Sequence, residues 1–147
     1  MRIGLISDTH DLLRPEVLAW LRGSDRILHA GDICGEAVLE ALAQLAPVIA
    51  VRGNNDRGTW AKRLHATETV RLGDVLVHML HDLKGLALPA GARVVVSGHS
   101  HQPKVEEREG VLYVNSGSAG PRRFRLPVSA GELRIAGGEV SAHLIQF

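Results

Sequence analysis

The stretch RIGLISDTH, residues 2–10, contains the pattern that decides the fold class of this chain. Residues 2–7 form a short, strongly apolar run that ends in polar residues, which is typical of a buried strand in a parallel sheet. Asp8 and His10 follow this run directly. In open α/β sheets, ligands bind outside the carboxyl ends of the strands. The stretch therefore predicts a parallel sheet and indicates the edge at which a functional site would lie.

The residues that follow alternate between helix and strand patterns. Residues 14–23 predict a helix, because Pro15 suits its first turn and apolar residues share one face. Further strands are predicted over residues 26–30 and 48–53, with a second amphipathic helix over residues 35–46 between them. This β-α-β-α-β order predicts parallel strands joined by right-handed crossovers.

The second half of the chain consists of shorter runs separated by turns that contain glycine. Such breaks between alternating runs predict β-hairpins. The predicted hairpins join residues 67–73 to 74–80, 104–110 to 111–116, and 132–136 to 139–147, while residues 94–97 stand apart as a buried strand. We therefore expect one α/β domain over residues 1–147, with a largely antiparallel second half.

Composition excludes several classes of protein. Of the 147 residues, 45% are hydrophobic and 22% charged, which is typical of a globular chain rather than a disordered one. The net charge of +1 gives no reason to expect a stable nucleic-acid partner or an anionic membrane. Cys34 is the only cysteine, and no apolar run approaches the roughly 18 residues of a membrane span. These features predict a cytoplasmic protein; homo-oligomerisation stays open.

Side chains that can ligate metals follow five of the predicted strands. They comprise two carboxylates, one amide and four imidazoles: Asp8, His10, Asp32, Asn54, His81, His99 and His101. Each motif alone has a structural interpretation, such as a capped turn at Asp8 or a turn at residues 53–56. The Gly-His-Ser-His sequence is the most specific, since its i, i+2 spacing can place both rings on one side of an extended segment. Together the motifs predict a metal site.

This ordered set, Asp-x-His, Gly-Asp, Gly-Asn, His and Gly-His-x-His, resembles the calcineurin-like metallophosphoesterase superfamily. Within it, the chain is similar to the small bacterial and archaeal phosphodiesterases over residues 3–123. The resemblance implies two mixed β-sheets packed as a sandwich and flanked by helices. It also implies two divalent metal ions: one held by Asp8, His10 and His101, the second by Asn54, His81 and His99, with Asp32 bridging them.

The implied activity is hydrolysis of a small phosphodiester or other phosphoester. Two ions about 3.5–4 Å apart clamp phosphoryl oxygens and acidify a bridging water. The predicted catalytic set is Asp8, Asp32, Asn54 and His99. Mixed imidazole and oxygen ligands suit Mn²⁺, which we expect, and also Fe, Co²⁺, Ni²⁺ and Zn²⁺, far better than Ca²⁺. A phosphomonoesterase, or a non-catalytic scaffold such as an endosomal sorting subunit of this fold, is the alternative.

Two positions depart from the pattern of the superfamily. Asn55 stands where many members have a histidine that assists the leaving group, and asparagine cannot transfer a proton at neutral pH. Asp82 follows His81 where a glycine is usual, and it would either orient His81 or cap the next helix. Arg122 and Arg123 would contact substrate phosphate or remain solvated. We expect structural roles for His29, His78 and Cys34, so all three are left out of the site.

Overall fold

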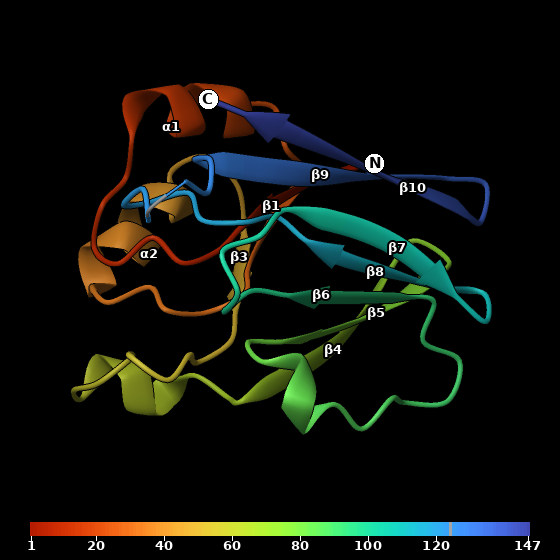
Figure 1. Ribbon diagram of the computed structural model, residues 1–147. Coiled ribbons are helices and arrows are strands. Elements are labelled where there is room, and N and C mark those ends of the chain that lie inside the picture. Colours follow the sequence, from red (N-terminus) through yellow and green to blue (C-terminus); the bar gives the residue numbers. More distant parts are fainter. Residues whose placement is uncertain (124) are drawn as a thin grey trace.

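In a computed structural model, which describes residues 1–123 and 125–147, the described chain forms two five-stranded sheets. The strand orders are β10-β9-β1-β2-β3 and β4-β5-β6-β8-β7, hereafter sheet one and sheet two. Figure 1 shows the two sheets stacked, with both α-helices beside sheet one. No helix of the described residues is long and apolar enough to cross a membrane.

Sheet one contains the β-α-β-α-β unit predicted from the sequence. Its parallel strands are β1 (Arg2–Ile6), β2 (Arg26–His29) and β3 (Val48–Ala50), connected by α1 (Pro15–Leu21) and α2 (Glu36–Ala43). A hairpin of β9 (Ser129–Ala136) and β10 (Glu139–Gln146) completes the sheet, because β9 pairs antiparallel with β1. The last hairpin of the chain thus returns to the first strand.

Sheet two combines hairpins with a parallel centre. The antiparallel pairs are β4 (Thr67–Leu72) with β5 (Val75–Leu80), and β7 (Lys104–Arg108) with β8 (Val111–Asn115), as predicted. Strand β6 (Val94–Ser97), however, pairs in parallel with both β5 and β8. The sequence predicted this strand only as buried and did not assign its direction, and the hairpins of the second half are antiparallel as predicted. The long connection through the 3-10 helix η2 (Leu83–Gly85) lets the chain return and run in the same direction as β5.

Two apolar clusters hold the layers together. The first lies between the sheets and includes Ile3, Leu5 and Leu28 of sheet one with Val77, Met79, Val94 and Val96 of sheet two. The second packs α1 and α2 onto the other face of sheet one, and η1 (Trp60–Arg63) contributes Trp60 to its edge. All four residues of β6 are buried, which explains its run of valines.

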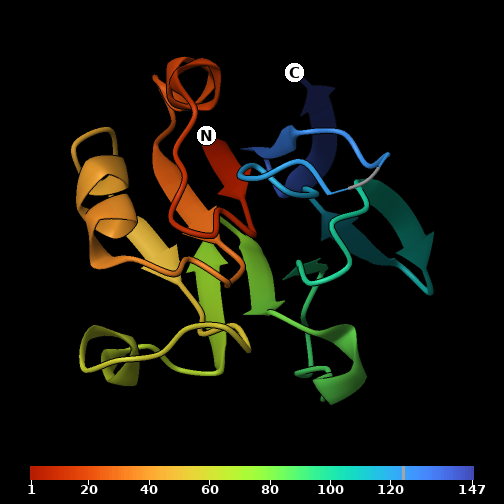
Figure 2. The same cartoon turned by 60° about the vertical axis from the view of Figure 1, so that its left-hand side comes forward.

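The parallel strands bring the functional segments to one edge. Because β1, β2 and β3 run in the same direction, their carboxyl ends lie next to one another, and the same holds for β5 and β6. Figure 2 shows the loops that follow these strands gathered between the two sheets. The predicted arrangement of two mixed sheets flanked by helices is confirmed, and it places the strand-end side chains together.

Candidate metal centre

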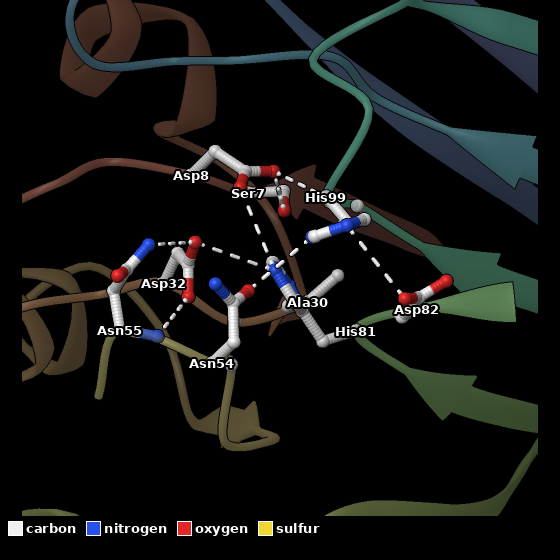
Figure 3. A network of polar contacts seen from close by, with 12 residues as sticks. Ser7, Asp8, Ala30, Asp32, Asn54, Asn55, His81, Asp82 and His99 are labelled. Carbon is white, nitrogen blue, oxygen red and sulfur yellow. Dashed lines mark hydrogen bonds and ion pairs between the residues drawn. The ribbon is translucent and has the colours of Figure 1, made fainter. Parts of the chain in front are cut away.

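Five of the predicted ligands come together as two overlapping groups. Asp8, His10 and His101 form one, and Asp8, Asp32 and His81 form the other, with the potential ligand atoms of each group within 4.8 Å of one another. The remaining two predicted ligands face each other beside them, because His99 Nδ1 lies 3.2 Å from Asn54 Oδ1 (Figure 3). The fold therefore gathers all seven predicted residues at one place.

Two carboxylate oxygens form the centre of this cluster. Asp8 Oδ1 lies 3.3 Å from His101 Nε2, 3.9 Å from His10 Nε2 and 3.9 Å from His81 Nε2. Asp32 Oδ2 lies 3.7 Å from His10 Nε2 and 3.4 Å from His81 Nε2. His10 Nε2 and His81 Nε2 thus face both carboxylates, although the carboxylates follow different strands.

Several polar atoms of the cluster are buried without a hydrogen-bond partner. They are Asp8 Oδ1, His10 Nε2, His81 Nε2 and His101 Nδ1. A buried polar group without a partner costs free energy, and such groups mark strained sites, catalytic sites or ion sites. Of these atoms, His10 Nε2 and His81 Nε2 both lie 3.9 Å from the unpaired Asp8 Oδ1, and imidazole nitrogens beside a carboxylate oxygen are a donor set that binds divalent transition metals. The residues therefore fit a metal ion.

The other atoms of the same side chains are already bonded. His81 Nδ1 donates to the carbonyl of Ala30 at 2.7 Å, which leaves Nε2 free as a ligand. Asp8 Oδ2 accepts from Ser7 Oγ at 2.6 Å and from the backbone N–H of His99 at 3.1 Å, which leaves Oδ1. These bonds orient the ligand atoms toward the centre of the cluster before any ion binds.

The charges of the cluster follow from burial and from these contacts. Burial alone would raise the pKa of Asp32, but His81 and Asn55 more than offset it, so that the pKa lies well below the usual value. Burial is likewise outweighed at Asp8, whose pKa is lowered by His101 and Ser7. Burial would lower the pKa of His81, yet Asp32 and Asp8 raise it. Both carboxylates are therefore anionic at neutral pH.

The backbone of the ligand loops is strained. Five of the predicted ligand residues have positive φ angles: Asp8 (53°), His10 (45°), Asp32 (56°), His99 (72°) and His101 (62°). A non-glycine residue in the left-handed region costs on the order of 1–3 kcal/mol and clusters at functional sites. The backbone N–H of Asp8 donates to Gly31 O and that of His10 to Asp32 O, both at 3.0 Å. Bonds between the two loops thus stabilise the strained turns.

Glycine allows the closest of these approaches. Gly31 has a φ of +101°, and a Cβ at this position would lie 2.7 Å from His81 Nδ1. At Gly98, a Cβ would collide with Ser7 Oγ and lie 2.7 Å from Asp8 Oδ2. Any side chain at either position would push loops of the two sheets apart. The Gly-Asp and Gly-His motifs therefore contain glycine for steric reasons.

Comparison with known proteins identifies the family. The family model for the calcineurin-like phosphoesterase superfamily domain matches residues 1–137. A probable metallophosphoesterase of Methanothermobacter thermautotrophicus is 40% identical over 162 residues, which covers 99% of this chain and 92% of that protein. The chain belongs to the calcineurin-like phosphoesterase superfamily. The resemblance inferred from its motifs is confirmed.

Solved structures show the same superfamily fold. An archaeal phosphodiesterase superposes with a TM-score of 0.79 at 24% identity, covering 99% of this chain and 100% of the other. Vps29 of Chaetomium thermophilum superposes with a TM-score of 0.85 at 19% identity, covering 99% and 87%. At these identities the similarity shows the fold alone.

One residue that supports the superfamily site was missed by the sequence analysis. Asp56 is 6% exposed and accepts four backbone N–H bonds at 2.7–3.0 Å. The donors are Asp32, Ile33 and Cys34 from the loop after β2, and Gly53 from the loop after β3. In the sequence, Asp56 lies two residues after Asn54 in a predicted turn, and nothing distinguished it from an ordinary turn residue.

Two histidines outside the site have the structural roles predicted for them. His29 is fully buried, where its Nδ1 accepts from the N–H of Gly31 at 3.1 Å and its Nε2 lies 3.0 Å from Thr9 Oγ1. His78 Nδ1 lies 2.8 Å from Thr69 Oγ1 across the β4–β5 hairpin. The hydrogen-bond partners of both rings are thus hydroxyl or backbone groups rather than the predicted ligands.

Asp82 and Cys34 lie beside the site. Asp82 caps η2 by accepting from the N–H of Lys84 at 3.0 Å, as one of the two predictions had it. Its second oxygen lies 3.6 Å from Nε2 of His99 rather than near His81. Cys34 Sγ lies 3.6 Å from His10 Nδ1, and burial raises the pKa of the thiol to about 11, which makes it a poor nucleophile at neutral pH.

Proposed function

We propose that this chain is a dinuclear metal-dependent phosphodiesterase. The observation that supports this most strongly is the set of unpaired carboxylate and imidazole atoms buried where the two sheets meet. Asp8, His10 and His101 would hold one ion, and Asn54, His81 and His99 the other. Asp32 would bridge them, because its Oδ2 faces both His10 and His81.

Asp8, Asp32 and His10 have the protonation states that this function needs. Asp8 and Asp32 are anionic at neutral pH because their pKa values are lowered. Burial lowers the pKa of His10, and the charge of Arg123 adds to this effect while Asp32 and Asp8 oppose it, so the ring is neutral as a nitrogen ligand must be. Two divalent cations bound here would neutralise the phosphoryl oxygens and lower the pKa of water. We infer Mn²⁺ from the mixture of nitrogen and oxygen donors.

A small cavity beside Asn54 and His99 supports a small phosphoester substrate. Its volume is about 310 Å³, at the lower limit for ligand pockets. Its polar lining consists of Arg52, Asn54, Thr67, His81, Asp82 and His99. A protein of Methanocaldococcus jannaschii named as a phosphodiesterase is 29% identical over 139 residues, covering 80% of this chain and 83% of its own. We therefore favour a diester as the substrate. We also propose that Arg123 contacts the phosphate of the substrate and that the protein acts in the cytoplasm.

Metal analysis combined with activity tests this proposal. Protein loaded with Mn²⁺ should contain about two ions per chain, and a chelator should abolish hydrolysis of bis(p-nitrophenyl) phosphate. Asp32→Ala should lose more activity than Asn54→Ala at saturating Mn²⁺, because Asp32 Oδ2 faces histidines of both ligand groups, whereas Asn54 faces His99 of one group. Gln102→Ala, an exposed amide next to His101, serves as the control. One ion or none, together with activity that survives the chelator, would contradict the proposal.

The same assay separates the enzyme from the two alternatives. Vps29 of Entamoeba histolytica, solved with Zn²⁺, shares this fold with a TM-score of 0.77 at 21% identity, covering 99% of each chain. Metal binding alone therefore does not distinguish a scaffold from an enzyme, whereas turnover does. A phosphomonoesterase would hydrolyse p-nitrophenyl phosphate faster than the diester. We expect the reverse order of rates.

A further inference from the structure

Asn55 makes two hydrogen bonds to the carboxylate that we assign as the bridge. Its backbone N–H donates to Asp32 Oδ1 at 2.9 Å, and its side-chain amide donates to Asp32 Oδ2 at 2.9 Å. Figure 3 shows the two bonds approaching the carboxylate from one side, with His81 on the other. Asn55, which stands in place of the usual histidine of the superfamily, thus binds the carboxylate of Asp32.

These bonds determine how the carboxylate of Asp32 is turned. Two donors from one residue hold both oxygens, so rotation about the bond to the carboxylate would break at least one of them. In this orientation Oδ2 lies 3.7 Å from His10 Nε2 and 3.4 Å from His81 Nε2. A carboxylate held this way presents one oxygen to both groups of ligands.

The amide suits this task better than the imidazole that is usual at this position. Asparagine donates a hydrogen bond at every pH, because its amide does not titrate near neutrality. Its short side chain also reaches Asp32 from the adjacent loop while remaining exposed to solvent. Hydrogen bonds to the ligands of a metal orient those ligands and tune their affinity.

We propose that Asn55 is a positioning residue that orients Asp32 for metal binding, so that its effect on the reaction passes through metal affinity rather than through the leaving group. This inference rests on the proposed function, because it requires that Asp32 binds metal. Under this proposal, position 55 has a different role from that of the usual histidine, which explains why an asparagine can replace it. This role affects metal affinity, whereas assistance to the leaving group would affect the chemical step. Activity measured at a single metal concentration would not distinguish the two effects.

The test measures Mn²⁺ binding by calorimetry on wild-type protein and on Asn55→Ala. The alanine variant removes the side-chain bond and keeps the backbone N–H, and the exposure of Asn55 favours normal folding. Loss of such a bond to a metal ligand costs about 10- to 100-fold in metal affinity. We expect a loss in this range, unchanged binding in Gln102→Ala, and partial recovery in Asn55→Ser, whose hydroxyl can donate. Melting curves in chelator verify that each variant is folded.

Kinetics distinguish positioning from assistance to the leaving group. If Asn55 acts through Asp32, saturating Mn²⁺ should restore most of the activity of Asn55→Ala, and the dependence of rate on leaving-group pKa should stay unchanged. A loss that persists at saturating Mn²⁺ and grows with leaving-group pKa would overturn the inference, as would equal Mn²⁺ affinity in both proteins. Wild-type protein that binds no Mn²⁺ would instead overturn the proposed function, and this inference with it.

Discussion

His29 illustrates how single side chains around the site are held in one protonation state. Its Nδ1 accepts from the N–H of Gly31, so its Nε2–H donates to Thr9 Oγ1, and that hydroxyl donates to the carbonyl of Ile33. Both ring nitrogens are therefore used by the neutral form. A second proton would have to displace the Gly31 bond inside the core, and burial lowers the pKa of His29 to about 3.

Because of His29, the metal-free protein should become less stable as the pH is lowered. Above the unfolded pKa of about 6.5, His29 is neutral in both states. As the pH falls from there toward 3, the unfolded chain binds a proton that the folded chain does not, so the free energy of unfolding decreases by up to about 1.4 kcal/mol per pH unit. Urea unfolding of wild type and His29→Gln in chelator, at several pH values between 7.5 and 5, should show a shallower slope in the variant. Parallel slopes would contradict the assignment.

The loops after β2 and β3 behave as one unit because Asp56 joins them. These strands are parallel neighbours, so their ends lie side by side, and a backbone bond from the N–H of Val51 to the carbonyl of His29 continues one residue past β3. Asp56 supplies the acceptors for three N–H groups of the first loop and one of the second. Asp56 thereby ties the loop that carries Asp32 to the loop that carries Asn54.

Replacing Asp56 by asparagine should loosen this unit. The amide of asparagine retains one acceptor oxygen and turns the other position into a donor, so at least one buried N–H loses its partner. An unpaired buried donor costs about 1–3 kcal/mol, and we expect a loss of stability in this range with weaker Mn²⁺ binding. Asp74→Asn, at the exposed β4–β5 turn, is the matched control. Chemical denaturation and calorimetry of the two variants make the comparison, and equal effects would show that Asp56 is not special.

The molecule as a whole is arranged so that its site spans two sheets. Sheet one supplies Asp8, His10, Asp32 and Asn54, and sheet two supplies His81, His99 and His101. Hydrogen bonds already cross this boundary, from the N–H of His99 to Asp8 and from His81 to the carbonyl of Ala30. An ion held by both sheets would therefore stabilise their packing.

Loading with metal should consequently raise the melting temperature. A ligand at 100 times its dissociation constant stabilises the folded state by about 2.7 kcal/mol. For a protein of this size each kcal/mol corresponds to about 2–4 °C, so one Mn²⁺ should raise the melting temperature by about 5–11 °C. Thermal melts with Mn²⁺ and with chelator provide the measurement. Asp32→Ala should show a much smaller shift, and an equal shift in that variant would mean that Mn²⁺ binds elsewhere.

The strands, the helices and the identity of the clustered side chains could be predicted from local sequence. Each segment must bury its apolar side chains wherever it lies in the fold, so its local pattern shows its type. Examples are the apolar run of residues 94–97 and the helical spacing within residues 14–23. Predicted metal ligands such as Asp8 and His99 could be assigned to one edge of the sheets because parallel strands end together. The family follows from the order of these motifs along the chain.

Contacts between loops could only be decided by the tertiary structure. His99 and Asp8 lie 91 positions apart in the sequence, and Asn55 and Asp32 lie 23 apart, so no periodicity connects either pair. The same reason explains why Asp56 was missed and why Asp82 faces His99 instead of His81. Strand β6 could be predicted as buried, but its parallel place between β5 and β8 depends on how the chain returns through a long connection. Local patterns specify which surface a segment buries, whereas its neighbours in space are selected by the packing of the whole chain.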